Sequence, residues 1–292
     1  MAKTIARIKI EGVIEKESET YNQKWLLETI EKITEDKNNV ALMLYINSPG
    51  GAVYEADEVY VAVQKYKEET KRPVYAYFAS LAASGGYYIG CSADKIIANR
   101  NTLTGSIGVI AGHFVDISEP MKKYGIKAEI IHSGKNKTMG SIHEPVTEEQ
   151  RAIMQSISDE CYAQFTGIVA ESRKLELEKV KELADGRIYT ASQAKNSGLI
   201  DEIATFEQAV EILKEKELGD KEFKAEVKKF EVKQKKSLMK FIKGASSIFG
   251  GRGPAAIGTA GVVEQALISA VSSGAGTNVK FPAFLYEGGF WK

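Results

Sequence analysis

Hydrophobic and polar positions follow two rhythms along the chain, and each rhythm predicts a different kind of element. Residues 5–10 alternate apolar and polar side chains, which is typical of a half-buried strand. Residues 40–46 and 74–78 are apolar throughout, as expected of strands that are covered on both faces. Residues 21–36 and 53–69 place apolar side chains at helical spacing. This order of elements predicts an α/β fold with a mainly parallel sheet.

The same alternation continues more weakly in the second part of the chain. Thr147 and Gln150 have the spacing of a capping box, so we expect a long helix from there to about residue 172. Shorter elements complete the pattern, namely strands at residues 95–98, 107–110 and 127–131, and helices at residues 176–183, 191–197 and 206–216.

The composition changes near residue 219, which predicts one domain over residues 1–218 and an extension over residues 219–292. Residues 220–243 carry nine lysines and four acidic residues. This stretch favours a solvated helix face, with contact to anionic lipid as the alternative. Residues 244–277 are rich in Gly, Ala and Ser, as a connector would be.

The end of the chain, residues 281–292, is strongly aromatic. Burying one Phe-sized side chain contributes about 1.5–3 kcal/mol, so we expect this tail to dock on protein. It could pair with a strand edge in a substrate groove, contact a neighbouring subunit, or form a final strand of its own domain. The aromatic residues are Phe281, Phe284, Tyr286, Phe290 and Trp291.

Charge and composition narrow the classes of function. The 292 residues include 39 basic and 39 acidic side chains, so the net charge of +0 gives no general attraction to nucleic acid. Two cysteines exclude a disulfide scaffold and a Cys-rich zinc module, and the three histidines lack the i, i+4 spacing of a metal site on a helix. No apolar run reaches the 18 or so residues that a membrane helix needs, so the chain as given is expected to be soluble.

Two turns of small residues, each directly after a predicted buried strand, are the candidates for chemistry. The first is Asn47-Ser-Pro-Gly-Gly51, where glycines allow close approach of another backbone. The second is Ala82-Ala-Ser-Gly-Gly86, which places Ser84 at a strand-to-helix turn. A nucleophile at such a turn has an unpaired helix N–H beside it, here that of Gly85.

A serine nucleophile needs a base, and the residues alone leave its identity open. His113, His132 and His143 qualify by type only. A lysine could serve instead, provided that desolvation lowers its pKa from about 10.4 to about 7–8. Lys135 and Lys137 follow a predicted strand and are the lysine candidates.

Four motifs in order give the chain a family resemblance. They are Asn47–Gly51, Ala82–Tyr88, Leu103–Val109 and Ser133–Lys137. With them, residues 5–215 resemble the signal peptide peptidase A family in its short bacterial form. That family is similar in fold to Clp-type proteases and crotonases, which implies repeated β-β-α units.

The resemblance implies a serine endopeptidase with a Ser-Lys dyad. Ser84 matches the nucleophile, Lys137 the general base and Ser106 the hydroxyl that orients the lysine. Gly51 and Gly85 match the amides of the oxyanion hole. Lys135 departs from the pattern of several relatives, so the chain offers a second lysine that could be the general base.

The resemblance also implies substrates, partners and location. Apolar peptides, in particular the signal peptides left after secretion, are the implied substrates, and no cofactor is implied. Relatives form homo-oligomers, often octameric rings, and usually carry an N-terminal membrane anchor, so a membrane-associated bacterial protein is implied although this chain shows no such segment. Alternatives from other classes are a crotonase-like acyl-CoA enzyme, a phage-type capsid maturation protease and a catalytically silent scaffold.

Overall fold

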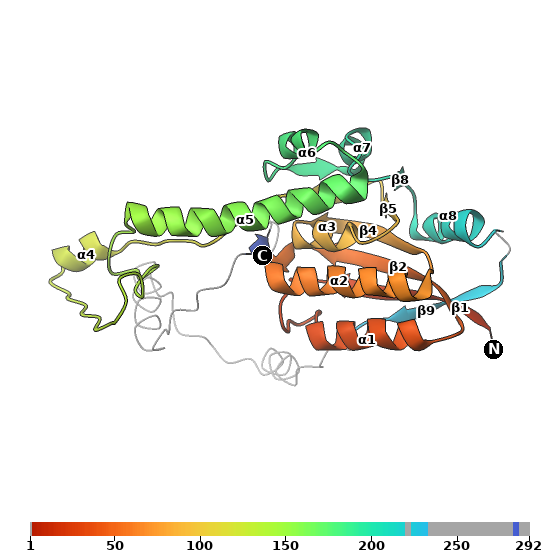
Figure 1. Ribbon diagram of the computed structural model, residues 1–292, viewed down its shortest axis with the longest axis horizontal. Coiled ribbons are helices and arrows are strands. Elements are labelled where there is room, and N and C mark those ends of the chain that lie inside the picture. Colours follow the sequence, from red (N-terminus) through yellow and green to blue (C-terminus); the bar gives the residue numbers. More distant parts are fainter. Residues whose placement is uncertain (1, 220–222, 233–282, 286–292) are drawn as a thin grey trace, which may run out of the picture.

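A mainly parallel sheet organises the protein, for which a computed structural model describes residues 2–219, 223–232 and 283–285 (Figure 1). Six strands follow one another across it in the order β7-β6-β4-β2-β1-β9, with β5 paired to β4, and β8 to β5. Every pairing in it is parallel except β6 with β7, which confirms the predicted α/β class. The strands are β1 (Lys3–Glu11), β2 (Asn39–Ser48), β4 (Val74–Ala83), β5 (Lys95–Ala98), β6 (Leu103–Gly105), β7 (Ile188–Thr190), β8 (Glu202–Ile203) and β9 (Ala225–Phe230).

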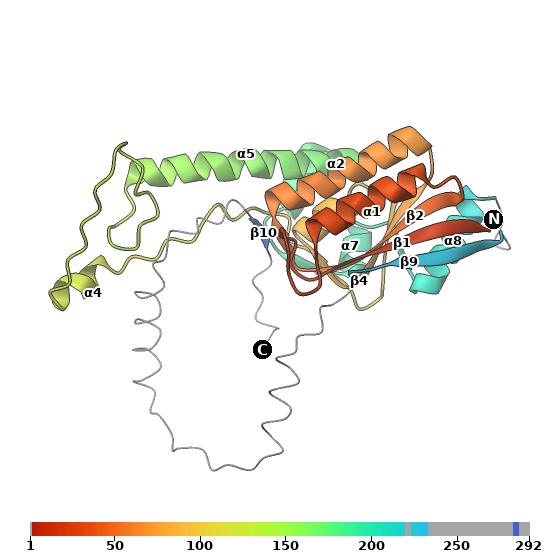
Figure 2. The ribbon, with the colours of Figure 1, turned by 90° about the horizontal axis from the view of Figure 1, so that it is seen from below.

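Helices cover both faces of this sheet. α1 (Gln23–Glu35) and α2 (Val53–Thr70) lie side by side on one face, and α8 (Phe206–Glu217) covers the other (Figures 1 and 2). Leu42 and Leu44 of β2 join the core under α1 and α2, whereas Met43 joins the core under α8. Burial on both sides explains why this strand is apolar throughout.

Side-chain caps set the starts of several helices. Asn22 accepts a hydrogen bond from the backbone of Trp25 and begins α1. Thr147 and Gln150 form the predicted capping box at the start of α5 (Glu148–Arg173), and matching Thr and Gln pairs begin α7 and α8. The remaining helices are α3 (Gly85–Gly90), α4 (Ser118–Lys123), α6 (Leu177–Leu183) and α7 (Ala191–Asn196).

Residues 111–161 form an arm that extends away from the sheet, with α4 near its far end (Figure 1). α5 buries only Phe165, Thr166 and Val169, all in its second half. Within the arm only Ser118 and Ser141 are buried. The arm therefore has little core of its own, although it carries eight exposed large apolar side chains: Phe114, Val115, Tyr124, Ile126, Ile130, Ile131, Ile142 and Ile157.

Three predictions of secondary structure are wrong. Residues 107–110 are not a strand, because the pairing with β4 is made earlier, by Leu103–Gly105. Residues 127–131 lie in the arm, where no described strand lies alongside them. Part of the lysine-rich stretch is the edge strand β9 and not a helix, because Ala225–Phe230 pairs with β1.

The proposed boundary at residue 218 stays a prediction, although β9 lies beyond it and completes the same sheet. Residues 233–282, which include the Gly/Ala/Ser-rich stretch, lie outside the described residues. Over the described ranges, no helix combines the length and the hydrophobicity needed to cross a membrane.

Candidate active site

Ser84 lies at a strained turn between β4 and α3, as predicted. Its backbone has φ 54° and ψ −120°, a positive-φ conformation that residues other than glycine rarely adopt. Hydrogen bonds hold it there, because its N–H donates to Gly105 O at 2.8 Å and its carbonyl accepts from Tyr88 N at 2.9 Å. Strain that the surroundings maintain in this way is a common feature of active sites.

The Ser84 hydroxyl has no partner within the described part of the chain. The residue is 1% exposed, and its buried Oγ makes no hydrogen bond. A buried hydroxyl without a partner costs free energy, so the turn holds Oγ in position for a group that lies outside the described residues.

Backbone amides lie beside this hydroxyl. Gly85 is the first residue of α3, and the first N–H groups of a helix have no acceptor within the helix. Gly86 packs directly on the first small-residue turn, since a Cβ placed on it would meet Ser48 O at 3.0 Å. The two turns that the sequence singled out therefore face each other.

Gly51 is fixed in the short strand β3 (Gly50–Ala52). It forms a bridge with Ile14, and a Cβ on Gly51 would lie 1.9 Å from Ile14 O. Ser48 ties the preceding residues together, because its Oγ donates to Gly12 O at 2.6 Å and accepts from Gly50 N at 3.1 Å. Only glycine fits this close approach of two backbones.

Ser106 is brought to the same place from β6. Gly105, immediately before it, accepts the hydrogen bond from Ser84 N, and Ser106 N donates to Arg187 O at 2.8 Å. Ser106 is also left-handed, with φ 51°. Four of the five predicted site residues therefore gather around one point, while their catalytic roles stay predictions.

Lys137 is not brought there. It lies in the arm between α4 and α5, as do Lys135, His132 and His143, and this segment is remote from α3 in Figures 1 and 2. His113 lies in the arm before α4. The Lys137 side chain is exposed, and Lys135 forms an ion pair with Glu149 on the arm itself. One copy of the chain thus holds the nucleophile and the amides at one place and the candidate base at another.

Two side-chain networks that sequence reasoning missed hold the turn rigid. Asn47 Oδ1 accepts from Ser80 Oγ at 2.7 Å and from Leu81 N at 3.2 Å, which locks β2 to β4 just before Ser84. Tyr88 OH donates to Asp57 Oδ1 at 2.6 Å, which anchors α3 on α2. Burial, together with this hydrogen bond, raises the pKa of Tyr88. The sequence offers one signal for these two networks, namely that Asn47 and Tyr88 belong to the family motifs.

Part of the aromatic tail reaches this site. β10 (Ala283–Leu285) pairs antiparallel with β3, with Phe284 opposite Gly51 and Leu285 opposite Gly50 (Figure 2). The expectation that the tail docks on protein is confirmed for these three residues. The strand that carries the candidate oxyanion glycine is therefore able to take an extended peptide beside it.

A metal site does not emerge in the described ranges, since no three His, Cys, Asp or Glu side chains there are grouped to hold an ion. What does emerge is a buried hydroxyl beside the N–H groups at the start of α3, on a turn that faces the turn containing Gly51. Such donors stabilise the negative charge that develops on a carbonyl oxygen under attack.

Comparisons with known proteins agree with this chemistry. The model of peptidase family S49 matches residues 66–219. A putative signal peptide peptidase SppA of Enterococcus faecium is 39% identical over 226 residues, covering 75% of this chain and 65% of that protein. A putative protease of Synechocystis is 39% identical over 208 residues, covering 71% and 72%. Protease 4 of Haemophilus influenzae is 33% identical over 209 residues, covering 70% and 34%.

Among solved structures, a mutant of ClpP1 from Listeria monocytogenes is similar with a TM-score of 0.46 and 17% identity. The match covers 68% of this chain and 90% of that one.

Proposed function

The chain belongs to peptidase family S49, a family of serine-type peptidases, and on that basis we propose that it is an endopeptidase that cleaves apolar peptides with Ser84 as nucleophile. The observation that carries this proposal is the strained, buried position of Ser84, whose Oγ has no partner among the described residues and whose neighbours are helix-start amides. Remnant signal peptides fit as substrates, since relatives are named for that activity.

The reaction is acyl transfer in two steps. Neutral Lys137 accepts the proton of Ser84, and Oγ forms a bond to the peptide carbonyl carbon. The N–H groups of Gly51 and Gly85 hold the oxyanion, and Ser106 orients the lysine. The protonated lysine then donates to the leaving amine, and water releases the acyl group from Ser84. No step requires a metal or an organic cofactor.

The arm supplies the base to another copy of the chain. Lys137 lies on an arm that exposes eight large apolar side chains, and so many exposed apolar side chains on one segment favour a protein–protein contact there. Ser84 Oγ lacks a partner in the described part of its own chain. We therefore assign the base to Lys137 of the partner subunit in a closed homo-oligomer. The family resemblance implies that this oligomer is a ring of about eight copies.

Substrate binds as a strand beside β3. An extended peptide there would pair with the backbone of Gly50–Ala52, as β10 does, and would bring its carbonyl between the amides of Gly51 and Gly85. Because remnant signal peptides are released at the membrane, we place the activity at the membrane of a bacterial cell.

Labelling with a fluorophosphonate tests the nucleophile. The reagent bonds its phosphorus to an activated serine oxygen as fluoride leaves, so we expect one label per chain, mapped to Ser84 by mass spectrometry. Ser84→Ala should abolish the label, and the buried Ser92→Ala variant serves as the control that keeps it. An acyl-CoA enzyme of similar fold needs no such serine. If Ser84 stays unlabelled and the Ser84→Ala variant keeps its catalytic activity, the peptidase mechanism is rejected.

The pairing of β10 with β3 predicts that the tail competes with substrate. Deletion of residues 279–292 should raise peptidase activity several-fold and lower KM more than it raises kcat, because the strand edge is freed. Deletion of residues 288–292 alone leaves Ala283–Leu285 in place and is the matched control, which should change little. Loss of folding on the longer deletion would show a structural strand instead, and loss of assembly would show a subunit contact.

A further inference from the structure

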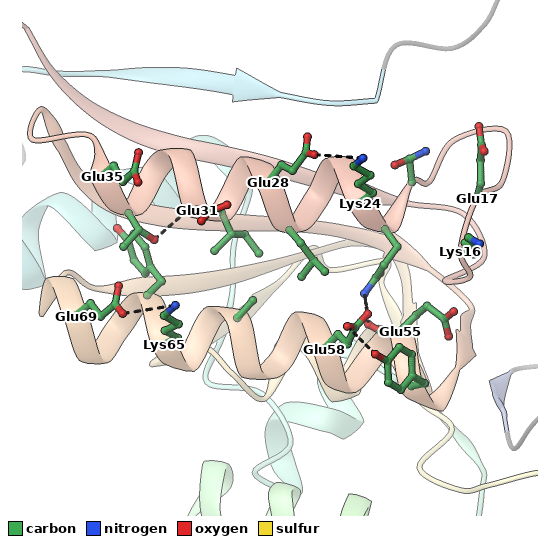
Figure 3. Close-up of a pocket in the computed structure, with 18 residues that line it drawn as sticks. Lys16, Glu17, Lys24, Glu28, Glu31, Glu35, Glu55, Glu58, Lys65 and Glu69 are labelled. Atoms are coloured by element: carbon green, nitrogen blue, oxygen red, sulfur yellow. Dashed lines mark hydrogen bonds and ion pairs between the residues drawn. The ribbon is translucent and has the colours of Figure 1, made fainter.

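A groove with a volume of about 1040 Å³ runs between α1 and α2, on the outer side of the helix layer (Figure 3). Its floor is apolar and includes Leu27, Ile30 and Ala62. Its rims are acidic, since seven glutamates and three lysines line it and leave four negative charges in excess. The combination of an apolar floor and an acidic rim suits a basic, amphipathic peptide segment.

Four of the seven rim glutamates are weakly paired or have no ion-pair partner among the described residues, whereas Glu58 accepts hydrogen bonds from Gln23 and Tyr54. Glu28 and Glu69 form long ion pairs with lysines of their own helices, at 3.9 Å and 3.7 Å, with largely exposed side chains. Such pairs contribute little. Glu31 and Glu35 are exposed along α1 and have no ion-pair partner in the described ranges (Figure 3). The rim therefore keeps charge available for a ligand.

The chain itself leads toward this groove. β9 runs parallel to β1, ends opposite Ile8, and points to the Lys24 end of α1 (Figure 3). Phe230, its last residue, packs on the core cluster that contains Leu26 and Ile30 of α1. The edge strand thus ends with a side chain on the same face of the sheet as α1 and α2.

The residues that follow have the complementary chemistry. Residues 233–243 read Lys-Gln-Lys-Lys-Ser-Leu-Met-Lys-Phe-Ile-Lys, with five lysines and no acidic side chain. Four of the remaining residues are large and apolar and could pack on the apolar floor of the groove, while the lysines could pair with the glutamates of its rims. Eleven residues reach at most about 36–40 Å, and α1 with its 13 residues is about 20 Å long, so the segment can follow the groove.

We propose that residues 233–243 dock in the groove between α1 and α2 of their own chain. The tether from β9 is only two residues long, Glu231 and Val232, so the effective concentration of the segment at the groove is high. Docking would hold the extension against the outer helix layer before the chain continues toward the aromatic tail. Surface charge pairs weaken with salt, so the contact should be salt-sensitive.

Zero-length crosslinking of the full-length chain tests the contact. A carbodiimide joins a lysine Nζ to a carboxylate as an amide only when the two groups touch. We expect crosslinks from Lys236, Lys240 or Lys243 to Glu31 and Glu35, mapped by mass spectrometry, with yields that fall at least fivefold in 0.5 M salt. A mixture of isotopically light and heavy chains should give crosslinks within one isotope only.

Matched variants keep the test independent of folding. Glu31→Gln with Glu35→Gln should expose residues 233–243 to trypsin, with cleavage after these lysines at least fivefold faster and an unchanged Tm. Glu207→Gln with Glu211→Gln, exposed and one turn apart on α8, is the control and should leave cleavage as it was. Crosslinks between light and heavy chains, equal crosslinking to α8, or protection that only vesicles of anionic phospholipid provide would each overturn the proposal.

Discussion

Ser84→Ala and Lys137→Ala chains are each expected to be inactive alone and to regain peptidase activity when they are co-expressed. Alone, each variant should lose activity by about 10³-fold or more, because a nucleophile and its base act as one unit. Together, a Lys137→Ala chain contributes an intact Ser84, and its neighbour contributes an intact Lys137. Random assembly of equal amounts in a closed ring restores the pair at about one site in four, so about a quarter of the wild-type activity should return.

Two controls make this complementation decisive. Lys135→Ala should keep most activity, because its side chain pairs with Glu149 on the arm. A chain that carries both Ser84→Ala and Lys137→Ala should rescue neither single variant at all, because it supplies neither the nucleophile nor the base. If mixtures of the single variants stay inactive although they co-assemble, the dyad forms within one chain and the arm must fold back on its own body.

The arm also shows where sequence patterns lose their meaning. Residues 127–131 alternate as a strand would, but no described strand pairs with them, and Ile130 and Ile131 are exposed. An alternating pattern indicates that one face of a segment is apolar, but it does not identify the segment or chain that packs against that face. The position of Lys137 in the arm, far from Ser84, is likewise not given by any local pattern.

Helices and strands that are determined by nearby residues in the sequence could be predicted. The Thr147 and Gln150 box begins α5 where expected, and the apolar run of β2 reflects burial on both of its faces. β9 was not predictable, since apolar and polar residues alternate only over the four residues 225–228 and the surrounding charge outweighs that signal. What makes it a strand is the free edge of β1, a long-range contact.

The site shows the same division between local and distant causes. The turn at Ser84 and the helix-start amide of Gly85 could be placed from the order of a strand, small residues and a helix. Ser106 could not, because its approach depends on the hydrogen bond between Ser84 N and Gly105 O across β4 and β6. Only the family motif pointed to it.

Gly51→Ala is expected to abolish most activity by moving β3. The added Cβ would lie 1.9 Å from Ile14 O, a backbone atom that cannot swing aside as a side-chain end could, so the bridge between Ile14 and Gly51 must open. The displacement withdraws one oxyanion donor, which typically costs about 10²–10³ in kcat. It also removes the edge on which an extended peptide pairs, so KM should rise as well.

Gly167→Ala is the matched control, because it adds the same methyl group to an exposed position of α5 where nothing lies within 4 Å of the new Cβ. In a helix interior this change contributes up to about 1 kcal/mol to stability, so that variant should be fully active with an equal or higher Tm. Gly51→Ala should in addition lower Tm, and fluorophosphonate labelling of Ser84 should persist more than peptide cleavage does, since β4 and α3 are not moved. Wild-type kcat in Gly51→Ala would show that the amide of residue 51 takes no part in holding the oxyanion, and would leave that role to the amides at the start of α3.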